Sequence, residues 1–486
     1  MIVETIVVLA MLAGGAALVR IGGLRGWGVP VLGAVAGISA FIAVGIVQLL
    51  LPVTTSPILT IALTAGIPLT AWLWLLFRRK DVGVHWLWAL LAGLGAIGGV
   101  AIFRMLRLSN WSYDSIQYIL NGALIASDNF DEASTGLVPK RLIGVPLIHA
   151  AGNISGDLYL PSITPLISGL IIALIAWLSW TALSRHLTRW MSVGIIATGL
   201  LLLISINRFI FHSFYINGHL LFGLLLLAVV GCSWLLATDD RVAMPALLLV
   251  VGLASIALVV IRAEGCIAVA LAILPIVLDE TTPVRFKTAL LASVGATVIG
   301  WQSFVAVAYL DDGLPTPFSV YGLLLVGVVM LGAIPILRWT RATRHRGLLL
   351  LVAELGLWLV LVILFLREPE MLIDSLDATV RNTVFGAGSW GLSLVMLLVL
   401  MVIVLCVSVP ESVRLRFPLT TFVPFAFILA YLRDAAYRVG DGDSLNRMWM
   451  QLVPLVVLYL VLAIGAGRWR PLRWSERSSA VQSPPL

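Results

Sequence analysis

The chain is 486 residues long, with 60% hydrophobic and only 11% charged residues and a mean hydropathy of +1.07. This composition excludes a soluble globular protein and indicates a polytopic membrane protein without room for a large soluble domain. The net charge of +7 would suit a nucleic-acid partner, but the basic residues follow the membrane topology described below, so we expect no nucleic acid.

Hydrophobic segments occur along the whole chain and predict an all-α fold with about 15 transmembrane helices. They lie at roughly 2–19, 29–50, 57–77, 84–106, 158–183, 190–206, 216–237, 243–261, 265–278, 288–309, 319–337, 347–366, 391–410, 418–436 and 451–467. No basic residue precedes the first apolar run, so we interpret it as a retained span and not as a signal peptide. We divide the chain into N-terminal transmembrane helices (1–106), an outer loop (107–157), a transmembrane core (158–467) and a basic, disordered cytoplasmic tail (468–486).

The basic residues predict one orientation for these segments. With the N-terminus outside and the C-terminus inside, most of the 31 Lys and Arg residues fall in the inner loops, as the positive-inside rule requires. The outer loops are then 107–157, 207–215, 262–264, 310–318, 367–390 and 433–450. We expect interfacial helices in these outer loops, because most of the ionisable residues that could form a site lie there, near the ends of the spans.

The longest outer loop begins with an amphipathic stretch at 107–128. A helix would place polar residues on one face and apolar residues on the other. The polar set is Asp114, Gln117, Tyr118, Asn121 and Asp128, and the apolar set is Ile116, Ile119, Leu120, Ala123, Leu124 and Ile125. Trp111 and Tyr113 at its start are typical of a membrane–water boundary, so this helix is predicted to lie on the bilayer surface. Asp114 in its first turn either caps the helix or serves as a general base at the membrane surface.

Arg262 and Glu264 interrupt 36 largely apolar residues, so the chain is expected to turn there and to present both groups at the outer surface. Two interpretations stay open for this pair. The two side chains could form an ion pair that stabilises a tight turn, or the carboxylate could orient the arginine toward a phosphate.

The last outer loop contains several arginines and aspartates, including Arg433, and it leads into the final span at Arg447. Asp441-Gly-Asp443 has a spacing that some glycosyltransferases use for a divalent metal, but Asp and Gly also favour turns, and we favour the turn. Arg447 could be a snorkelling anchor or a phosphate contact. His212 is one of the ionisable residues in the short outer loop 207–215.

These motifs resemble the C-fold (GT-C) glycosyltransferases, multi-span enzymes that use polyprenyl-phosphate sugars outside the cytoplasmic leaflet. The resemblance rests on Trp-Ser-Tyr-Asp-Ser-Ile-Gln-Tyr at 111–118, Lys-Arg-Leu-Ile-Gly-Val-Pro-Leu-Ile-His-Ala at 140–150, Ile-Arg-Ala-Glu-Gly at 261–265 and Asn-Arg-Met at 446–448. It implies that Asp114, the acid of the first large outer loop, is the catalytic base. The acid loop of the family follows the first span, whereas here it follows the fourth, which implies three additional N-terminal spans. The large C-terminal soluble domain of many members is absent from this sequence.

The resemblance and the chemistry of the residues together predict an inverting sugar transfer from a polyprenyl-phosphate donor to an envelope glycan or lipid acceptor. Asp114 would act as base and Arg262 or Arg447 would hold the phosphate, without a cofactor unless a divalent metal binds. The other expected substrate-binding residues are Glu264, Arg433, Tyr118, Gln117 and His212. Arginine outnumbers lysine, which favours a bacterial plasma membrane. The alternatives are a transporter or flippase and a non-catalytic scaffold, although we find no inverted repeat and the polar residues gather at one face.

Overall fold

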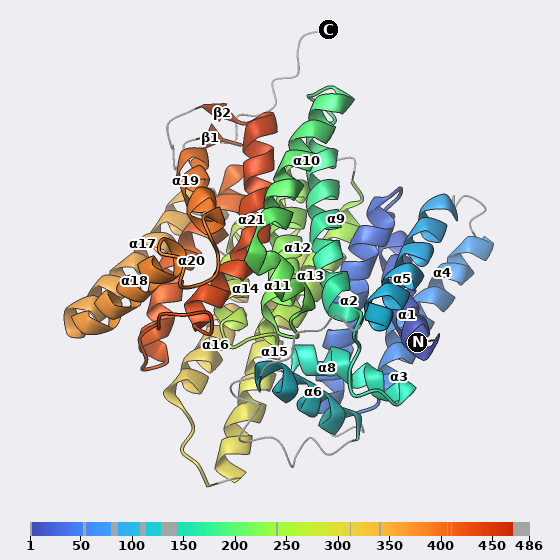
Figure 1. The fold of residues 1–486 in the computed structure, drawn as a ribbon, viewed down its shortest axis with the longest axis horizontal. Coiled ribbons are helices and arrows are strands. Elements are labelled where there is room, and N and C mark those ends of the chain that lie inside the picture. Colours follow the sequence, from blue (N-terminus) through green and yellow to red (C-terminus); the bar gives the residue numbers. More distant parts are fainter. Residues whose placement is uncertain are drawn as a thin grey trace.

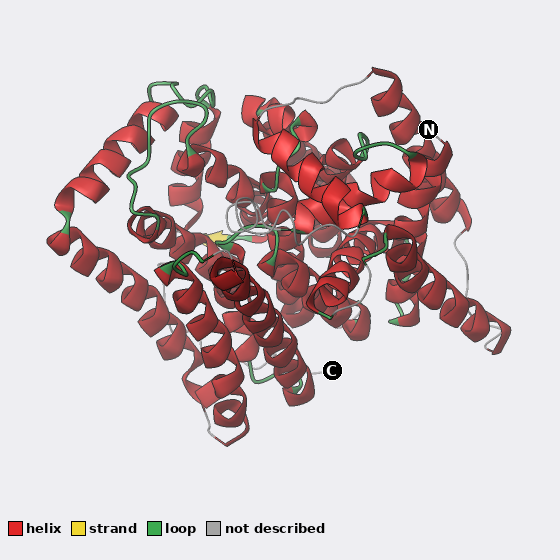
Figure 2. Ribbon diagram, turned by 90° about the horizontal axis from the view of Figure 1, so that it is seen from below, coloured by secondary structure: helices red, strands yellow, loops and turns green. Residues whose placement is uncertain are grey.

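A computed structural model describes residues 2–51, 55–78, 86–106, 113–127, 143–239, 242–311, 313–339, 342–405, 407–409 and 411–469. These residues are helical almost throughout, as Figure 2 shows, which confirms the predicted all-helical fold. Loops and turns connect the helices (Figure 2), and one short antiparallel pair is formed by β1 (Val407–Ser408) and β2 (Arg468–Trp469). The predicted disordered tail began at 468, but Arg468 and Trp469 form β2; the rest of it, from 470 onward, lies outside the described residues, as do Trp111 and Asp128.

The helices of the first half of the chain are α1 (Ile2–Ile21), α2 (Gly28–Leu50), α3 (Pro57–Ile61), the π-helix η1 (Ala62–Gly66), α4 (Ile67–Arg78), α5 (Trp86–Leu106), α6 (Tyr113–Ala126), α8 (Gly144–Ala150), the 3₁₀ turn η3 (Ala151–Ser155), α9 (Ile163–Leu183), α10 (Arg189–Ser205), α11 (Asn207–Phe214) and α12 (His219–Thr238). The second half contains α13 (Met244–Val259), α14 (Gly265–Val277), α15 (Val284–Asp311), α16 (Phe318–Trp339), the 3₁₀ turn η4 (Ala342–His345), α17 (Arg346–Arg367), α18 (Pro369–Thr383), α19 (Ser393–Leu405), α20 (Ser412–Leu432) and α21 (Ser444–Ala466).

Ten helical stretches among the described residues are long and apolar enough to cross a membrane, or eleven if the bent pair α10–α11 is one span. The predicted number of about 15 is therefore larger than the described helices support. The difference comes from shorter apolar helices, including α13, α14 and part of α19, each of fewer than 18 residues. A transmembrane helix needs about 20 residues, so these segments satisfy the hydropathy pattern but not the length.

Several of the predicted outer loops lie toward one end of the molecule. In Figure 1, α6, α8, the connection from α15 to α16 and the loop before α21 lie toward the lower end, whereas β1, β2 and the start of α10 lie toward the upper end. The grouping of these loops agrees with the predicted threading. Which end faces the cytoplasm remains a prediction from the positive-inside rule.

The centre of the molecule is built around α12 and α21. Helix α12 is buried on all sides, against α9, α13, α14, α20 and α21, which suits its uniformly apolar sequence. Helix α21 also packs against α9, α10 and α20. Because α21 is central, a side chain in its first turn can meet residues from several distant segments.

Helices α1 and α2 cross with their backbones in close contact. Gly33 and Gly37 of α2 have the small-xxx-small spacing, and they face Ala16, Gly15 and Met11 of α1. A Cβ added at Gly37 would overlap the carbonyl of Met11, and one added at Gly15 would overlap the backbone of α2. Glycine is therefore required here for the helices to approach closely.

Candidate functional site

Asp114 forms an ion pair with Arg447, 333 residues further along the chain. Asp114 lies in the first turn of α6 and Arg447 in the first turn of α21, and their side chains are 14% and 16% exposed. The hydroxyl of Tyr215, in the turn after α11, donates to Oδ2 of Asp114 at 3.4 Å. The structure thus brings together two residues that the sequence assigned separately to catalysis and to phosphate binding.

The position of Arg447 is fixed by the N-terminal cap of α21. One carboxylate oxygen of Asp443 accepts from the backbone N–H of Asn446 at 3.0 Å, and the other accepts from the N–H of Arg438 at 2.9 Å. A capping carboxylate satisfies free N–H groups of the first turn and is favoured by the helix dipole. The positive end of the same dipole disfavours the positive charge of Arg447, and the negative charge of Asp114 offsets this unfavourable interaction.

The alternative metal site at Asp441-Gly-Asp443 receives no support from this geometry. Both oxygens of Asp443 are used in the cap, and Oδ1 of Asp441 accepts from Ser389 at 2.5 Å and from Arg208 at 3.1 Å. The described part of the chain contains no group of three His, Cys, Asp or Glu side chains that could hold a metal ion. The favoured interpretation, in which these aspartates organise a turn, fits the contacts.

Arg262 and Glu264 form an ion pair in the turn between α13 and α14. Burial alone would raise the pKa of Glu264, but the charge of Arg262 and hydrogen bonds from Arg262 and Gln451 hold that pKa below its ordinary value. Burial alone would likewise lower the pKa of Arg262, but Glu264, Tyr118 and Asp114 raise it. The pair is therefore ionised, and Asp114 is close enough to contribute to its field. Both interpretations of the pair, a turn-stabilising contact and an oriented arginine, remain compatible with this arrangement.

Gln451 and His219 connect this pair to α21 and α12. Nε2 of Gln451 donates to Oε1 of Glu264 at 3.0 Å and lies 3.3 Å from Nδ1 of His219. Nε2 of His219 lies 3.4 Å from Nη1 of Arg262. Either ring nitrogen of His219 can accept a hydrogen bond from these neighbours, and which one does depends on its tautomer.

The short helix α11 bends by 71° from α10 and carries Arg208 and His212 into the same region. Nδ1 of His212 lies 2.8 Å from the backbone oxygen of Arg208, which can only accept, so Nδ1 carries the proton and Nε2 carries the lone pair. The ring of His212 contacts those of Tyr215 and His219, with centroids 5.7 and 5.9 Å apart. His212 therefore lies between the Asp114 contact and the Arg262 contact.

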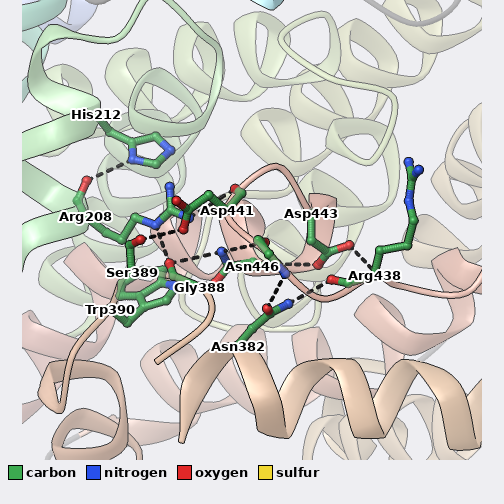
Figure 3. A network of polar contacts seen from close by, with 11 residues as sticks. Arg208, His212, Asn382, Gly388, Ser389, Trp390, Arg438, Asp441, Asp443 and Asn446 are labelled. Atoms are coloured by element: carbon green, nitrogen blue, oxygen red, sulfur yellow. Dashed lines mark hydrogen bonds and ion pairs between the residues drawn. The ribbon is translucent and has the colours of Figure 1, made fainter. Parts of the chain in front are cut away.

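A network of polar contacts holds Arg208 and the loop before α21 in place (Figure 3). Nε of Arg208 donates to the backbone oxygen of Gly388 at 2.6 Å, and Nη2 donates to the backbone oxygen of Asp441 at 3.0 Å. The buried amide of Asn446 accepts from Trp390 Nε1 at 2.5 Å and donates to Gly388 at 3.1 Å. The network joins α11, the segment after α18 and the start of α21, so it gives the candidate site a rigid wall.

The polar residues of α6 are on its buried or half-buried side, and part of its apolar face is exposed. Tyr118 and Asn121 are buried, at 1% and 0% exposure, whereas Ile116 and Leu120 are 45% and 50% exposed. The buried stripe packs on α8 and the exposed aliphatic residues face outward, because tertiary packing and an apolar environment override simple amphipathicity. Tyr118 still lies near the site, since it is among the groups that raise the pKa of Arg262. Gln117 is partly buried on the same helix.

Arg433 lies at the margin of the cluster. Its side chain is exposed, and its guanidinium is 5.9 Å from the ring centroid of Tyr437. Burial raises the pKa of the Tyr437 hydroxyl, Arg433 opposes this, and Glu264 adds to it. Arg433 therefore approaches the central residues only through Tyr437.

The sequence placed His219 among the ionisable residues at the outer edge that could form the site, but it did not indicate Tyr215 or Gln451. Gln451 follows Arg447 by four residues, so the helical spacing of α21 already places both side chains on one face. His212, Tyr215 and His219 are three and four residues apart, but they do not lie on one helix, because the chain turns between α11 and α12. Their convergence depends on the bend after α10, which the sequence did not reveal.

Several buried polar atoms in this cluster make no hydrogen bond with the protein. Among the described residues they include Nε of Arg447, Nε2 of His212 and Oε1 of Gln451. Buried polar groups are paired in the great majority of cases, and a catalytic role or a bound water or ion is one explanation for an unpaired one. We refer to Asp114, Arg447, Arg262, Glu264, His212, His219, Tyr215, Gln451 and Arg208 as the central cluster.

The central cluster can therefore hold an anion and accept a proton within one partly enclosed region. Comparison of the chain with protein-family models, with curated proteins and with solved structures finds no significant match.

Proposed function

We propose that the protein is a membrane glycosyltransferase that transfers a sugar from a polyprenyl-phosphate donor to a glycan or lipid acceptor, with inversion at the anomeric carbon. The observation that carries the proposal is the ion pair between Asp114 and Arg447 at the centre of the cluster. A carboxylate and an arginine side by side are the two groups that this reaction needs, one for the acceptor proton and one for the phosphate.

In the resting protein, Arg447 neutralises Asp114. The donor phosphate competes for Arg447, whose buried Nε has no partner and can complete a charge-assisted contact with a phosphate oxygen. Asp114 is then released to accept a proton. Donor binding and activation of the base are coupled in this scheme because they share one arginine.

In the transfer step, one proton moves, one bond forms and one bond breaks. The acceptor hydroxyl loses its proton to a carboxylate oxygen of Asp114, and its oxygen forms a bond to the anomeric carbon. The bond from that carbon to the phosphate oxygen breaks, and the polyprenyl phosphate leaves with the electron pair. Arg447 and Arg262 stabilise the leaving phosphate, while Tyr215 orients Asp114 through its hydrogen bond.

The remaining members of the cluster would bind and orient the sugar. His212 presents an acceptor nitrogen, and Gln451 presents a carbonyl oxygen, so both can receive hydrogen bonds from sugar hydroxyls. Glu264 holds Arg262 in place. We place this site on the outer face of a bacterial plasma membrane, among membrane lipids, following the orientation that the basic residues favour.

One observation favours the alternative of a transporter or flippase. The 71° bend between α10 and α11 is a broken helix, and broken helices form substrate sites in many transporters. In this alternative, the central cluster would bind a lipid-linked or small polar substrate without any bond being broken.

The purified protein separates the two proposals when it is given radiolabelled polyprenyl-phosphate sugars and a mixture of lipid and glycan acceptors in detergent. A glycosyltransferase releases polyprenyl phosphate and labels an acceptor in micelles, where transport has no meaning. A transporter leaves the donor intact in micelles and moves it only across sealed liposomes. The surface variant Asp377→Asn, which alters an exposed ion pair on α18, serves as the control for non-specific effects.

A further inference from the structure

A cavity of about 450 Å³ lies among the N-terminal helices, lined by residues of α1, α2, α4, α5 and α9 and by Gly26. None of its lining residues belongs to the central cluster. The lining is almost entirely aliphatic side chains and glycine, and among the described residues Arg20 is its one ionisable member. The cavity lies within the range of roughly 300–1,000 Å³ that is typical of small-molecule sites.

The arginine defines one end of this cavity. Arg20 lies in the last turn of α1, and its Nη1 donates to the backbone oxygen of Leu24 at 3.0 Å. Arg25, in the following turn, is exposed and does not line the cavity, but its positive charge acts on Arg20. An anion bound between the two guanidinium groups would relieve the repulsion between their charges.

The opposite end of α1 lies on the side of the molecule that carries α6 and α8 (Figure 1). Glu4 accepts hydrogen bonds from the hydroxyl of Ser162 at 2.7 Å and from its N–H at 3.1 Å, and α1 contacts η3 and α3, which lie beside α6 and α8. A helix of 20 residues is about 30 Å long. The Arg20 end of the cavity is therefore about one membrane thickness away from the level of Asp114.

The walls of the cavity border the part of the surface that suits lipid. On α4 and α5, the helices that flank it, Leu73, Trp74, Leu91, Leu94 and Ile97 are exposed. In Figure 1, α1, α4 and α5 form the outer group on one side of the molecule, so a hydrocarbon chain could enter from the bilayer without crossing the protein core. Basic pockets between transmembrane helices are a known way of binding anionic lipid head groups.

We propose that this cavity binds an acyl chain of an anionic phospholipid, with its phosphate held by Arg20 and Arg25. The apolar lining accommodates the hydrocarbon, and the two arginines select the negative head group. A polyprenyl phosphate bound here would place its phosphate at the wrong end of α1 for Asp114, so the occupant is a phospholipid and not the donor. This site is independent of the proposed glycosyl transfer and gives the additional N-terminal helices a role.

The test is native mass spectrometry of the purified full-length protein with phosphatidylglycerol, phosphatidylcholine or polyprenyl phosphate added. Gly93→Leu fills the cavity, because Gly93 lines it and a Cβ there meets no atom within 4 Å. Gly98→Leu is the matched control, since it lies on the same helix, also has open space at its Cβ, and does not line the cavity. Arg20→Gln tests the head-group contact separately.

The expected result is that the wild-type protein retains phosphatidylglycerol, that Gly93→Leu lowers this retention at least tenfold, and that Gly98→Leu leaves it unchanged. Arg20→Gln is expected to lower the preference for phosphatidylglycerol over phosphatidylcholine about fivefold, since one basic residue near an anionic head group contributes about 1 kcal/mol. Equal retention by Gly93→Leu and Gly98→Leu overturns the site. Unchanged preference in Arg20→Gln overturns the head-group assignment, and stronger retention of polyprenyl phosphate overturns the choice of lipid.

Discussion

The ion pair of Asp114 and Arg447 predicts a measurable coupling between α6 and α21 that does not depend on any enzymatic activity. Asp114→Asn and Arg447→Met each remove one charge and leave the other partly buried. Two opposite charges about 4 Å apart attract by about 4 kcal/mol at an effective dielectric constant of 20, and desolvation and side-chain ordering offset part of this. Surface pairs contribute about 0–1 kcal/mol, and breaking a fully buried pair costs about 3–5 kcal/mol. With exposures of 14% and 16%, we expect each single variant to lose about 2 kcal/mol.

The assay is a double-mutant cycle on the free energy of unfolding in detergent. We expect the double variant to lose clearly less than the sum of the two single variants, with a coupling of about 1–2 kcal/mol. The pair Asp377 and Arg381 on α18, with side chains 53% and 58% exposed, is the matched control and should show a coupling below about 0.5 kcal/mol. If the effects of Asp114→Asn and Arg447→Met simply add, the two residues do not interact, and the reasoning about a shared arginine is refuted.

Three other predictions concern residues that shape the fold. Burial lowers the pKa of His149 to about 4, and its Nδ1 accepts from the N–H of Leu160, so the neutral ring belongs to the folded state. The neutral ring contributes fully to the free energy of unfolding above pH 6.5, and up to about 3 kcal/mol of this contribution is lost as the pH falls toward 4. The variant His149→Asn should therefore flatten this part of a plot of melting temperature against pH. Gly37→Ala should destabilise the α1–α2 crossing by about 1–3 kcal/mol in thermal unfolding, whereas an equal or higher stability would contradict the close contact. Asp443→Ala should cost about 1 kcal/mol through loss of the α21 cap, and Asp443→Ser should recover most of it.

The helical class and the common end of several outer loops followed from hydropathy and charge, because these properties are local and summed over many residues. The number of spans could not be predicted from hydropathy, since the short helices α13, α14 and α19 are apolar, and an apolar helix can either cross the membrane or pack inside the protein. The spacing also did not say which face of α6 would be buried: Asn121 on the polar face is buried, whereas Ile116 and Leu120 on the apolar face are exposed. Amphipathic spacing predicts burial in water, and it loses this meaning where both protein and lipid are apolar.

For the candidate site, the sequence indicated individual residues but not which of them are in contact. Asp114, Arg262, Glu264 and Arg447 were found because each is an ionisable residue beside an apolar run, where a charge is costly unless it is used or paired. Their pairing could not be predicted, since the partner of Asp114 lies 333 residues away and its position depends on the central place of α21.

The most direct test of the account is single-turnover transfer from a radiolabelled polyprenyl-phosphate sugar, measured together with donor binding, for the wild-type protein and for Asp114→Asn. Loss of the base should lower the rate of transfer by about 100- to 10,000-fold. Donor binding should be retained or strengthened, because Arg447 is then no longer neutralised by a carboxylate. Transfer by Asp114→Asn at the wild-type rate would contradict the role of Asp114 as the base.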